Sequence, residues 1–258
     1  MVGRHHKIGV MKVHVRPLAV LVAATVVLSV AACGSRADDR EDARTHASAP
    51  SPASVAPKTS AAPAAATTPV TDARPRIVVL GDSLTAGLDL RVSDSYPSLL
   101  QERLKAEGLD FAVVNAGVSG DTSAGGLARL DWALQGDVRV LIIALGGNDG
   151  LRGLTAEELR DNLAHIIERA QARGIRVILA GMEAPPNYGR DYIVSFHKVY
   201  PALAAKYHVA FVPFLLQGVA GSETLNQRDG IHPTAAGARI VADNVWAVLK
   251  PIIERSGS

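Results

Sequence analysis

The sequence has a single cysteine, Cys33, and aromatic residues make up only 4% of its 258 residues. One cysteine excludes a disulfide-stabilised scaffold and a zinc site built from several cysteines. The shortage of aromatic side chains argues against a platform on which single-stranded nucleic acid could stack. Hydrophobic residues nevertheless make up 48% of the chain. That is enough for a buried core, and it excludes a wholly disordered protein.

An excess of positive charge is missing from most of the chain. Residues 1–32 carry four basic and no acidic side chains, whereas residues 75–258 carry 18 basic and 20 acidic ones. The formal net charge of +2 therefore has its origin in the first segment. A domain without a basic patch lacks the electrostatic footprint of a nucleic-acid-binding protein. We expect neither DNA nor RNA as a partner.

The first 32 residues have the pattern of an export signal. Four basic residues precede an uncharged apolar run of 15 residues, 18–32. This run is shorter than the roughly 20 residues that span a bilayer, but it has the length of a signal-peptide core. It ends in two alanines followed by Cys33, which resembles a bacterial lipoprotein signal and predicts lipidation of Cys33. The alternative is a plain secretory signal cut after Ala32, and Met11 is a second candidate start.

Residues 33–74 are predicted to form a tether behind the lipidated cysteine. Of residues 34–74, 27 are Ala, Pro, Ser or Thr, and only two valines are large and aliphatic. Such a segment cannot bury enough apolar surface to offset the entropy of ordering. Residues 75–258 are then expected to form one domain. We expect the protein to be exported and held by its lipid at a membrane of the bacterial cell envelope, outside the cytoplasm.

Five apolar runs in that domain predict buried strands, at Ile77–Leu80, Phe111–Val114, Val138–Leu145, Ile175–Ala180 and Val209–Val212. Helical patterns lie between the runs, at Tyr96–Glu107, at Gly126–Leu134, from Thr155 onward with Glu158 completing a capping box, and from Thr234 to Leu249, stopping at Pro251. This alternation predicts a parallel sheet covered by helices on both faces. Ligands bind outside the carboxyl ends of such strands.

Residues able to do chemistry follow the first three strands. Ser83 comes just after the first strand, Gly117 ends the second, and Asn148 follows the third. Taken singly, each is also typical of ordinary local structure. A serine caps many helices, a glycine serves in many turns, and an asparagine often bonds its own backbone.

Asp229 and His232 stand three residues apart, just before the last helix. At this spacing the carboxylate can hold the Nδ1–H of the imidazole and leave Nε2 free as a base. We expect the other histidines of the domain, His165, His197 and His208, to be surface or core residues. Together with Ser83, Gly117 and Asn148, the pair would supply a nucleophile, a base, an orienting acid and oxyanion donors.

In this order the motifs resemble the SGNH (GDSL) hydrolases. Within them the chain is most similar to the bacterial thioesterase I/protease I/lysophospholipase and arylesterase group. The resemblance covers residues 76–253 and is carried by GDSLTAG at 81–87, GVSGDTSAGGLARL at 117–130, LGGNDGLRG at 145–153, PPNYG at 185–189 and DGIHP at 229–233. It implies a three-layer α/β/α sandwich of flavodoxin-like type, with a five-stranded parallel sheet in the order 2-1-3-4-5. It implies no metal and no organic cofactor.

The resemblance also implies roles for single residues. Ser83 would be the nucleophile, His232 the general base and then acid, and Asp229 the group that orients His232. The oxyanion hole would consist of the Ser83 N–H, the Gly117 N–H and the Asn148 side-chain amide. Substrate contacts would come from Asp149, Gly150, Leu151, Ala184, Pro185 and Tyr188, in the loops 149–155 and 182–192 that line the acyl pocket in this family. Beside these roles, Asp82, Asp121 and Asp149 are expected to brace loops through hydrogen bonds.

The function predicted on this basis is that of a serine esterase. It would cleave carboxylic esters or thioesters of acyl chains through an acyl-serine intermediate, as a lysophospholipase, thioesterase or arylesterase. Its partners would be a small-molecule acyl ester or lysophospholipid and a membrane, and it would act as a monomer. One alternative is a carbohydrate O-acetyl esterase. Another is an inactive hydrolase fold that serves as a surface binding lipoprotein.

Overall fold

The computed structural model describes residues 73–255. The expected signal, Cys33 and nearly all of the expected tether lie outside these residues, so the division of the chain into those segments stays a prediction. All strands and helices discussed below belong to the remaining domain.

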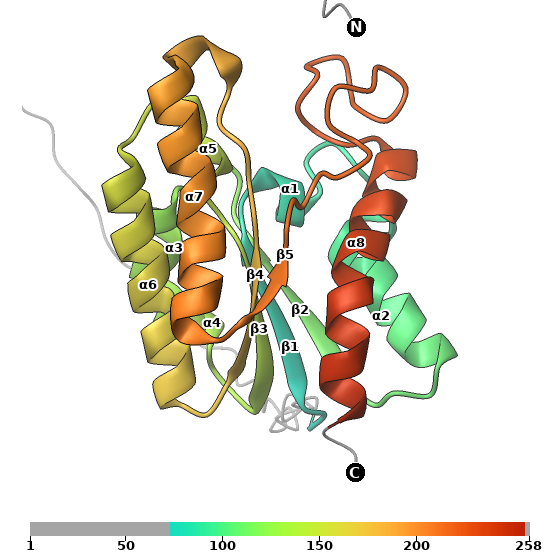
Figure 1. Ribbon diagram of the computed structural model, residues 1–258. Helices are drawn as coiled ribbons and strands as arrows, with labels where there is room; N and C mark the ends of the chain where they lie inside the picture. Colours follow the sequence, from blue (N-terminus) through green and yellow to red (C-terminus); the bar gives the residue numbers. More distant parts are fainter. Residues whose placement is uncertain (1–72, 256–258) are drawn as a thin grey trace, which may run out of the picture. The chain divides into compact units, whose positions relative to one another are not determined.

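Five strands form one parallel sheet in the order β2-β1-β3-β4-β5. The strands are β1 Arg76–Gly81, β2 Ala112–Gly117, β3 Val138–Ala144, β4 Arg176–Ala180 and β5 Ala210–Val212. Most side chains of β1, β3 and β4 are buried, because the sheet is covered on both faces. The predicted strand order and the predicted three layers are both confirmed (Figure 1).

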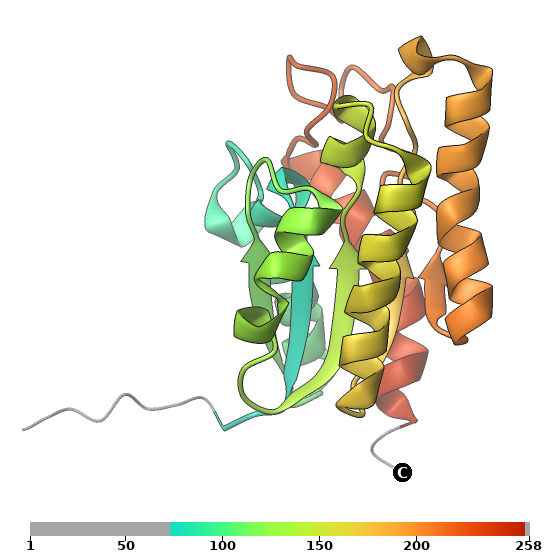
Figure 2. The same cartoon turned by 90° about the vertical axis from the view of Figure 1, so that its left-hand side faces the viewer.

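The helices form the two outer layers. On one face of the sheet lie α2 (Tyr96–Ala106) and α8 (Ala235–Glu254). On the other face lie α3 (Ser123–Ala128), α4 (Leu130–Ala133), α6 (Ala156–Ala172) and α7 (Arg190–Tyr207) (Figures 1 and 2). Two short helices, α1 (Ser83–Ala86) and α5 (Gly147–Leu151), begin directly at the carboxyl ends of β1 and β3. The 3₁₀ turns are η1 (Val92–Asp94) and η2 (Pro186–Tyr188).

The capping box predicted at the start of α6 is present. The Glu158 N–H donates to Thr155 Oγ1 at 3.1 Å, and the Thr155 N–H donates to the Glu158 carboxylate at 3.1 Å. These bonds satisfy backbone donors that have no partner inside the helix. The helix then buries the apolar stripe that its sequence predicts, formed by Leu159, Leu163, Ile166, Ile167 and Ala170.

Two predicted helix boundaries are wrong. The segment expected as one helix over Gly126–Leu134 is two short helices that meet at Arg129, and the first begins earlier because Thr122 Oγ1 caps it by accepting the Gly125 N–H. The last helix does not stop at Pro251 but continues to Glu254. A proline so close to a helix end removes only one of the last backbone bonds. Burial of the two following isoleucines, 252 and 253, holds the final turn against the core.

Two glycines fit α1 against the sheet. Gly81 and Gly117 are paired at the carboxyl ends of β1 and β2. A Cβ at Gly117 would lie 2.3 Å from the Ala86 nitrogen, and a Cβ at Gly81 would lie 2.0 Å from Thr85 Oγ1. Any larger side chain would push α1 away from the strands. These glycines therefore fix where the first residue of α1, Ser83, stands at the edge of the sheet.

The core beneath α1 contains one isolated polar contact that yields a stability prediction. Thr85 Oγ1 and the Tyr96 hydroxyl lie 2.7 Å apart, and both residues are buried. Tyr96→Phe leaves the threonine hydroxyl without this partner, and we expect it to lower the free energy of unfolding by about 1–3 kcal/mol. Thr85→Val removes the other half of the contact. Urea denaturation of both single variants and the double variant should show that the double variant costs less than the sum, and additive costs would contradict this.

Candidate active site

Ser83, His232 and Asp229 form a continuous chain of hydrogen bonds. Ser83 is the first residue of α1, and the other two lie in the long segment between β5 and α8. His232 Nε2 lies 2.8 Å from Ser83 Oγ, and His232 Nδ1 lies 2.6 Å from Asp229 Oδ2. Ser83 and His232 are 149 residues apart in the sequence, and the fold brings them within hydrogen-bonding distance at the edge of the sheet.

The protonation of this chain follows from its partners. The pKa of Asp229 is lowered to about 2, mainly by the hydrogen bond to His232 and then by the N–H groups of Ile231 and His232, which donate to Asp229 Oδ1. An ionised carboxylate only accepts, so His232 Nδ1 carries the proton that it donates to Asp229. In the neutral imidazole, Nε2 is then an acceptor for the Ser83 hydroxyl. This is the arrangement of a general base poised on a nucleophile.

A glutamine fastens the loop that carries His232. The Gln227 side-chain amide donates to the carbonyl oxygens of Leu88 and Pro233, at 2.9 and 3.0 Å. The Gln227 N–H donates to the His232 carbonyl oxygen at 2.7 Å. Leu88 follows α1 directly, so these bonds tie the histidine loop to the segment that carries the serine.

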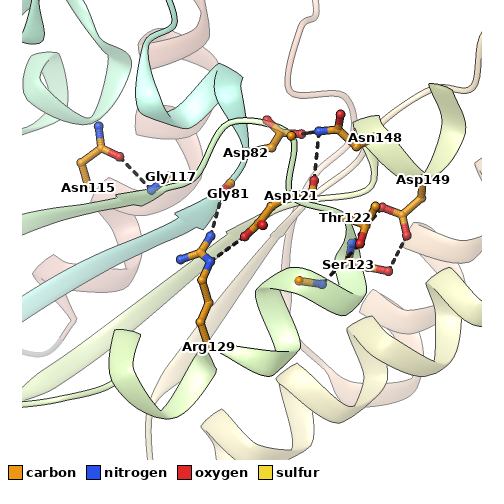
Figure 3. A network of polar contacts seen from close by, with 12 residues as sticks. Gly81, Asp82, Asn115, Gly117, Asp121, Thr122, Ser123, Arg129, Asn148 and Asp149 are labelled. Carbon is orange, nitrogen blue, oxygen red and sulfur yellow. Dashed lines mark hydrogen bonds and ion pairs between the residues drawn. The ribbon is translucent and has the colours of Figure 1, made fainter. Parts of the chain in front are cut away.

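Two of the three groups expected as oxyanion donors already have acceptors within the protein. The Gly117 N–H donates to Asn115 Oδ1 at 3.0 Å. The Asn148 amide donates to the Asp121 carbonyl oxygen at 2.9 Å and to Asp82 Oδ2 at a longer 3.3 Å (Figure 3). The third, the Ser83 N–H, lies in the first turn of α1, where N–H groups lack partners inside the helix.

Asp82 lies between the serine and the asparagine. It caps α1 by accepting the Leu84 N–H at Oδ1, at 3.0 Å, and it is only 2% exposed. Burial raises the pKa of Asp82 to about 6, although the Leu84 N–H and the nearby His232 oppose this rise. The expectation that Asp82 braces a loop agrees with these bonds, and the same carboxylate also contacts Asn148.

Arg129 connects the strand below the serine to the loop that holds the asparagine. Its Nε donates to Asp121 Oδ2 at 2.6 Å, and its Nη2 donates to the Gly81 carbonyl oxygen at 2.8 Å (Figure 3). Asp121 in turn offers its own carbonyl oxygen to Asn148. No sequence motif indicated Arg129, because a lone arginine in a helical pattern carries no signal of such a role.

Asp149 serves the scaffold and does not contact the cavity. Its carboxylate accepts the Ser123 N–H at 2.8 Å and the Ser123 hydroxyl at 2.5 Å, and the residue is fully buried. Asn162 of α6 donates to the same hydroxyl at 3.0 Å. Asp149 therefore fastens the beginning of α5, which carries Asn148, to α3 and α6.

A cavity of about 440 Å³ opens beside the serine and histidine. Among the residues expected to contact substrate, Leu151, Ala184 and Pro185 line it. Asp149 and Gly150 do not, because one is turned toward Ser123 and the other is packed against Phe196. Tyr188 does not line it either. Its hydroxyl donates to the Leu151 carbonyl oxygen, and its side chain is exposed to solvent.

The cavity has further walls, and among them only Met182 and Glu183 lie in a loop that the resemblance implies. These walls come from the segment after β4 and from the long segment between β5 and α8, and include Met182, Glu183, Phe214, Leu216, Ala220 and Ile231. Most of these side chains are apolar. The segment that supplies Phe214, Leu216 and Ala220 has no periodic pattern and no motif before DGIHP, so the sequence offered no basis for placing these three.

The described residues contain neither a candidate metal site nor a candidate membrane-spanning helix. Within residues 73–255, no group of three or more His, Cys, Asp or Glu side chains is arranged to hold a metal ion. In the same range, no helix is both long and apolar enough to cross a membrane.

Comparison with known proteins agrees with this geometry. Residues 79–240 match the GDSL-like lipase/acylhydrolase family. Esterase TesA of Pseudomonas aeruginosa is 49% identical over 178 residues, which cover 69% of this chain and 89% of that protein. Thioesterase 1/protease 1/lysophospholipase L1 of Escherichia coli is 37% identical over 178 residues, with 69% and 84% covered. The crystal structure of TesA superposes with a TM-score of 0.66 over 68% of this chain and 98% of its own. The chain therefore belongs to the GDSL-like lipase/acylhydrolase family.

Proposed function

We propose that this chain hydrolyses carboxylic esters and thioesters of acyl chains, with Ser83 as the nucleophile. The observation that carries the proposal is the hydrogen-bonded chain from Ser83 through His232 to Asp229, at 2.8 and 2.6 Å, on the wall of a largely apolar cavity. Relatives named esterase, arylesterase and thioesterase/lysophospholipase support this class of reaction. An inactive binding protein would not need the three residues at these distances.

In the first half of the reaction, His232 Nε2 takes the hydroxyl proton while Ser83 Oγ attacks the carbonyl carbon. Asp229 remains ionised and stabilises the imidazolium that forms. The tetrahedral intermediate collapses when His232 gives its proton to the leaving alcohol or thiol, which leaves an acyl-Ser83 ester. In the second half, His232 activates a water molecule that attacks this ester and releases the acid.

The negative oxygen of the intermediate would be met by the Ser83 N–H, by the Asn148 amide, and by the Gly117 N–H once this group exchanges its 3.0 Å bond to Asn115 Oδ1 for one to substrate. Asn148 can turn one of its two amide hydrogens toward substrate by giving up the 3.3 Å bond to Asp82, while the 2.9 Å bond to the Asp121 carbonyl oxygen holds the group in place. Pre-oriented donors of this kind stabilise charge that exists mainly in the transition state.

The nucleophile and its base yield the central test. Ser83→Ala and His232→Ala should each reduce hydrolysis of p-nitrophenyl esters by at least about 10⁴-fold, and the double variant should be no slower than either single one, because the two groups act as a unit. Asp229→Ala should cost less. A serine-directed phosphonate should add its mass to Ser83 alone, as read by peptide mass spectrometry. Full turnover by Ser83→Ala would overturn the proposed mechanism.

The oxyanion donors yield a second test. It includes Arg129, which we expect to position Asn148 through Asp121. Asn148→Ala should lower kcat by about 10²–10³-fold with little change in KM. Arg129→Met should lower kcat by about tenfold, since a displaced donor loses part of the same stabilisation. Because Arg129 acts largely through the asparagine loop, adding Arg129→Met to Asn148→Ala should cost less than it does alone. A KM that rises while kcat is intact would instead assign Asn148 to ground-state binding.

We also propose that the chain is exported and anchored by a lipid on Cys33. This rests on the sequence, where two alanines and the only cysteine end a short apolar core behind four basic residues. A single acyl chain binds membranes only marginally, so stable anchoring requires more than one. The wild-type protein should fractionate with membranes, and Cys33→Ala should release it or alter its location. Mass spectrometry that finds an unmodified Cys33 at the mature N-terminus in the medium would refute the anchor.

A further inference from the structure

The cavity beside Ser83 is unevenly charged. Its lining includes two carboxylates, Asp82 and Glu183, and the imidazole of His232, but no lysine or arginine among the described residues. Asp82 is buried and its oxygens face the Leu84 N–H and the Asn148 amide. Glu183 is different, because it lies in the segment between β4 and η2 and its side chain is 38% exposed. It has no part in the proposed reaction steps.

One oxygen of Glu183 is held in place by α7. Glu183 Oε1 lies 2.7 Å from His197 Nδ1, and within residues 73–255 this is the only hydrogen bond or ion pair of the Glu183 carboxylate. An ionised carboxylate accepts at both of its oxygens. The carboxylate is thus fixed at one oxygen and able to receive a cation at the other.

The neighbours of Glu183 in the cavity suit a large, weakly hydrated cation. Phe214 lines the same cavity, together with Met182 and the prolines at 185 and 186. A quaternary ammonium group is attracted both to a carboxylate and to an aromatic ring face, and its methyl groups need apolar contacts. An anionic group would be repelled by Glu183 and would find no positive side chain in the lining.

We propose that Glu183 makes this cavity selective for esters that carry a cationic nitrogen, and selects against esters that carry a negative charge. This inference rests on the proposed esterase function, because it names the substrate class of the same site. It predicts charge selectivity separate from the catalytic steps, which need only Ser83, His232, Asp229 and the oxyanion donors.

The test compares cationic esters with neutral ones of the same shape. One pair is butyrylcholine and 3,3-dimethylbutyl butyrate, which places the charge in the alcohol. The other pair is the ethyl esters of 4-(trimethylammonio)butyrate and 5,5-dimethylhexanoate, which places it in the acyl chain. The quantity measured is the ratio of kcat/KM for the cationic ester to that for its neutral partner. It is determined for wild type, Glu183→Gln and a matched control, Glu102→Gln, an exposed residue of α2 outside the cavity lining.

Glu183→Gln should lower the ratio by about two- to fivefold in at least one pair, since a partly exposed charge interacts only modestly. Glu102→Gln makes the same change in net charge and should leave both ratios as in wild type. The effect of Glu183→Gln should shrink between about 0.01 and 1 M salt, because exposed charges are screened. If the ratios were equal in all three proteins for both pairs, the proposed charge selectivity would be overturned. The measured hydrolysis would still support the proposed esterase activity. If wild type hydrolysed none of these esters, or if Ser83→Ala hydrolysed them equally well, the proposed esterase activity would be overturned. The proposed charge selectivity would then fail with it.

Discussion

The site depends on the register of β1 between its two neighbours. Gly81 pairs with Gly117 on one side and with Ala144 on the other, so three strands end at nearly the same level. The residues that follow these ends are therefore brought to one edge, although they are far apart in sequence. In a parallel sheet, backbone groups at this edge point out of the strands and helices begin there. A serine, a backbone N–H and an asparagine amide meet because of this register.

The register brings these groups together, but buried polar contacts set their orientation. Arg129 bonds the end of β1 and the Asp121 side chain, and the Asp121 carbonyl oxygen holds Asn148. Asp149 fixes the start of α5 from the other side through Ser123. A side-chain amide on a free loop would sample many rotamers, and each would place its donors differently. Held in this way, the amide has only its longer bond to Asp82 to exchange, and a donor that needs so little rearrangement meets the condition for electrostatic stabilisation.

The order of the strands was implied by the resemblance to the SGNH hydrolases and not by the residues alone. The sequence was sufficient for the five buried strands and for the contact between Asp229 and His232, because both depend on short local signals. Apolar runs mark buried strands, and DGIHP places a carboxylate and an imidazole within one turn. It was not sufficient for the end of α8, where burial of Ile252 and Ile253 outweighs the helix-breaking tendency of Pro251. Nor did it place Phe214 in the cavity, since its position depends on how an irregular segment packs, and no periodicity encodes that packing.

Two carboxylates of the same site show how surroundings decide their charge. Asp229 is hydrated and accepts three hydrogen bonds, so its pKa falls to about 2 and its ionised form favours the fold above its ordinary pKa of 3.8. Asp82 is buried, so its pKa rises from 3.8 to about 6, and the fold binds its proton more tightly than the unfolded chain does. By linkage, Asp82 adds to stability as the pH falls from about 6 towards 3.8, and its ionisation opposes folding above that range. The contacts of Asp82 account for a carboxylate in this buried position. Asp82 caps the helix that begins with Ser83 and accepts from Asn148, so it joins the two residues across the site.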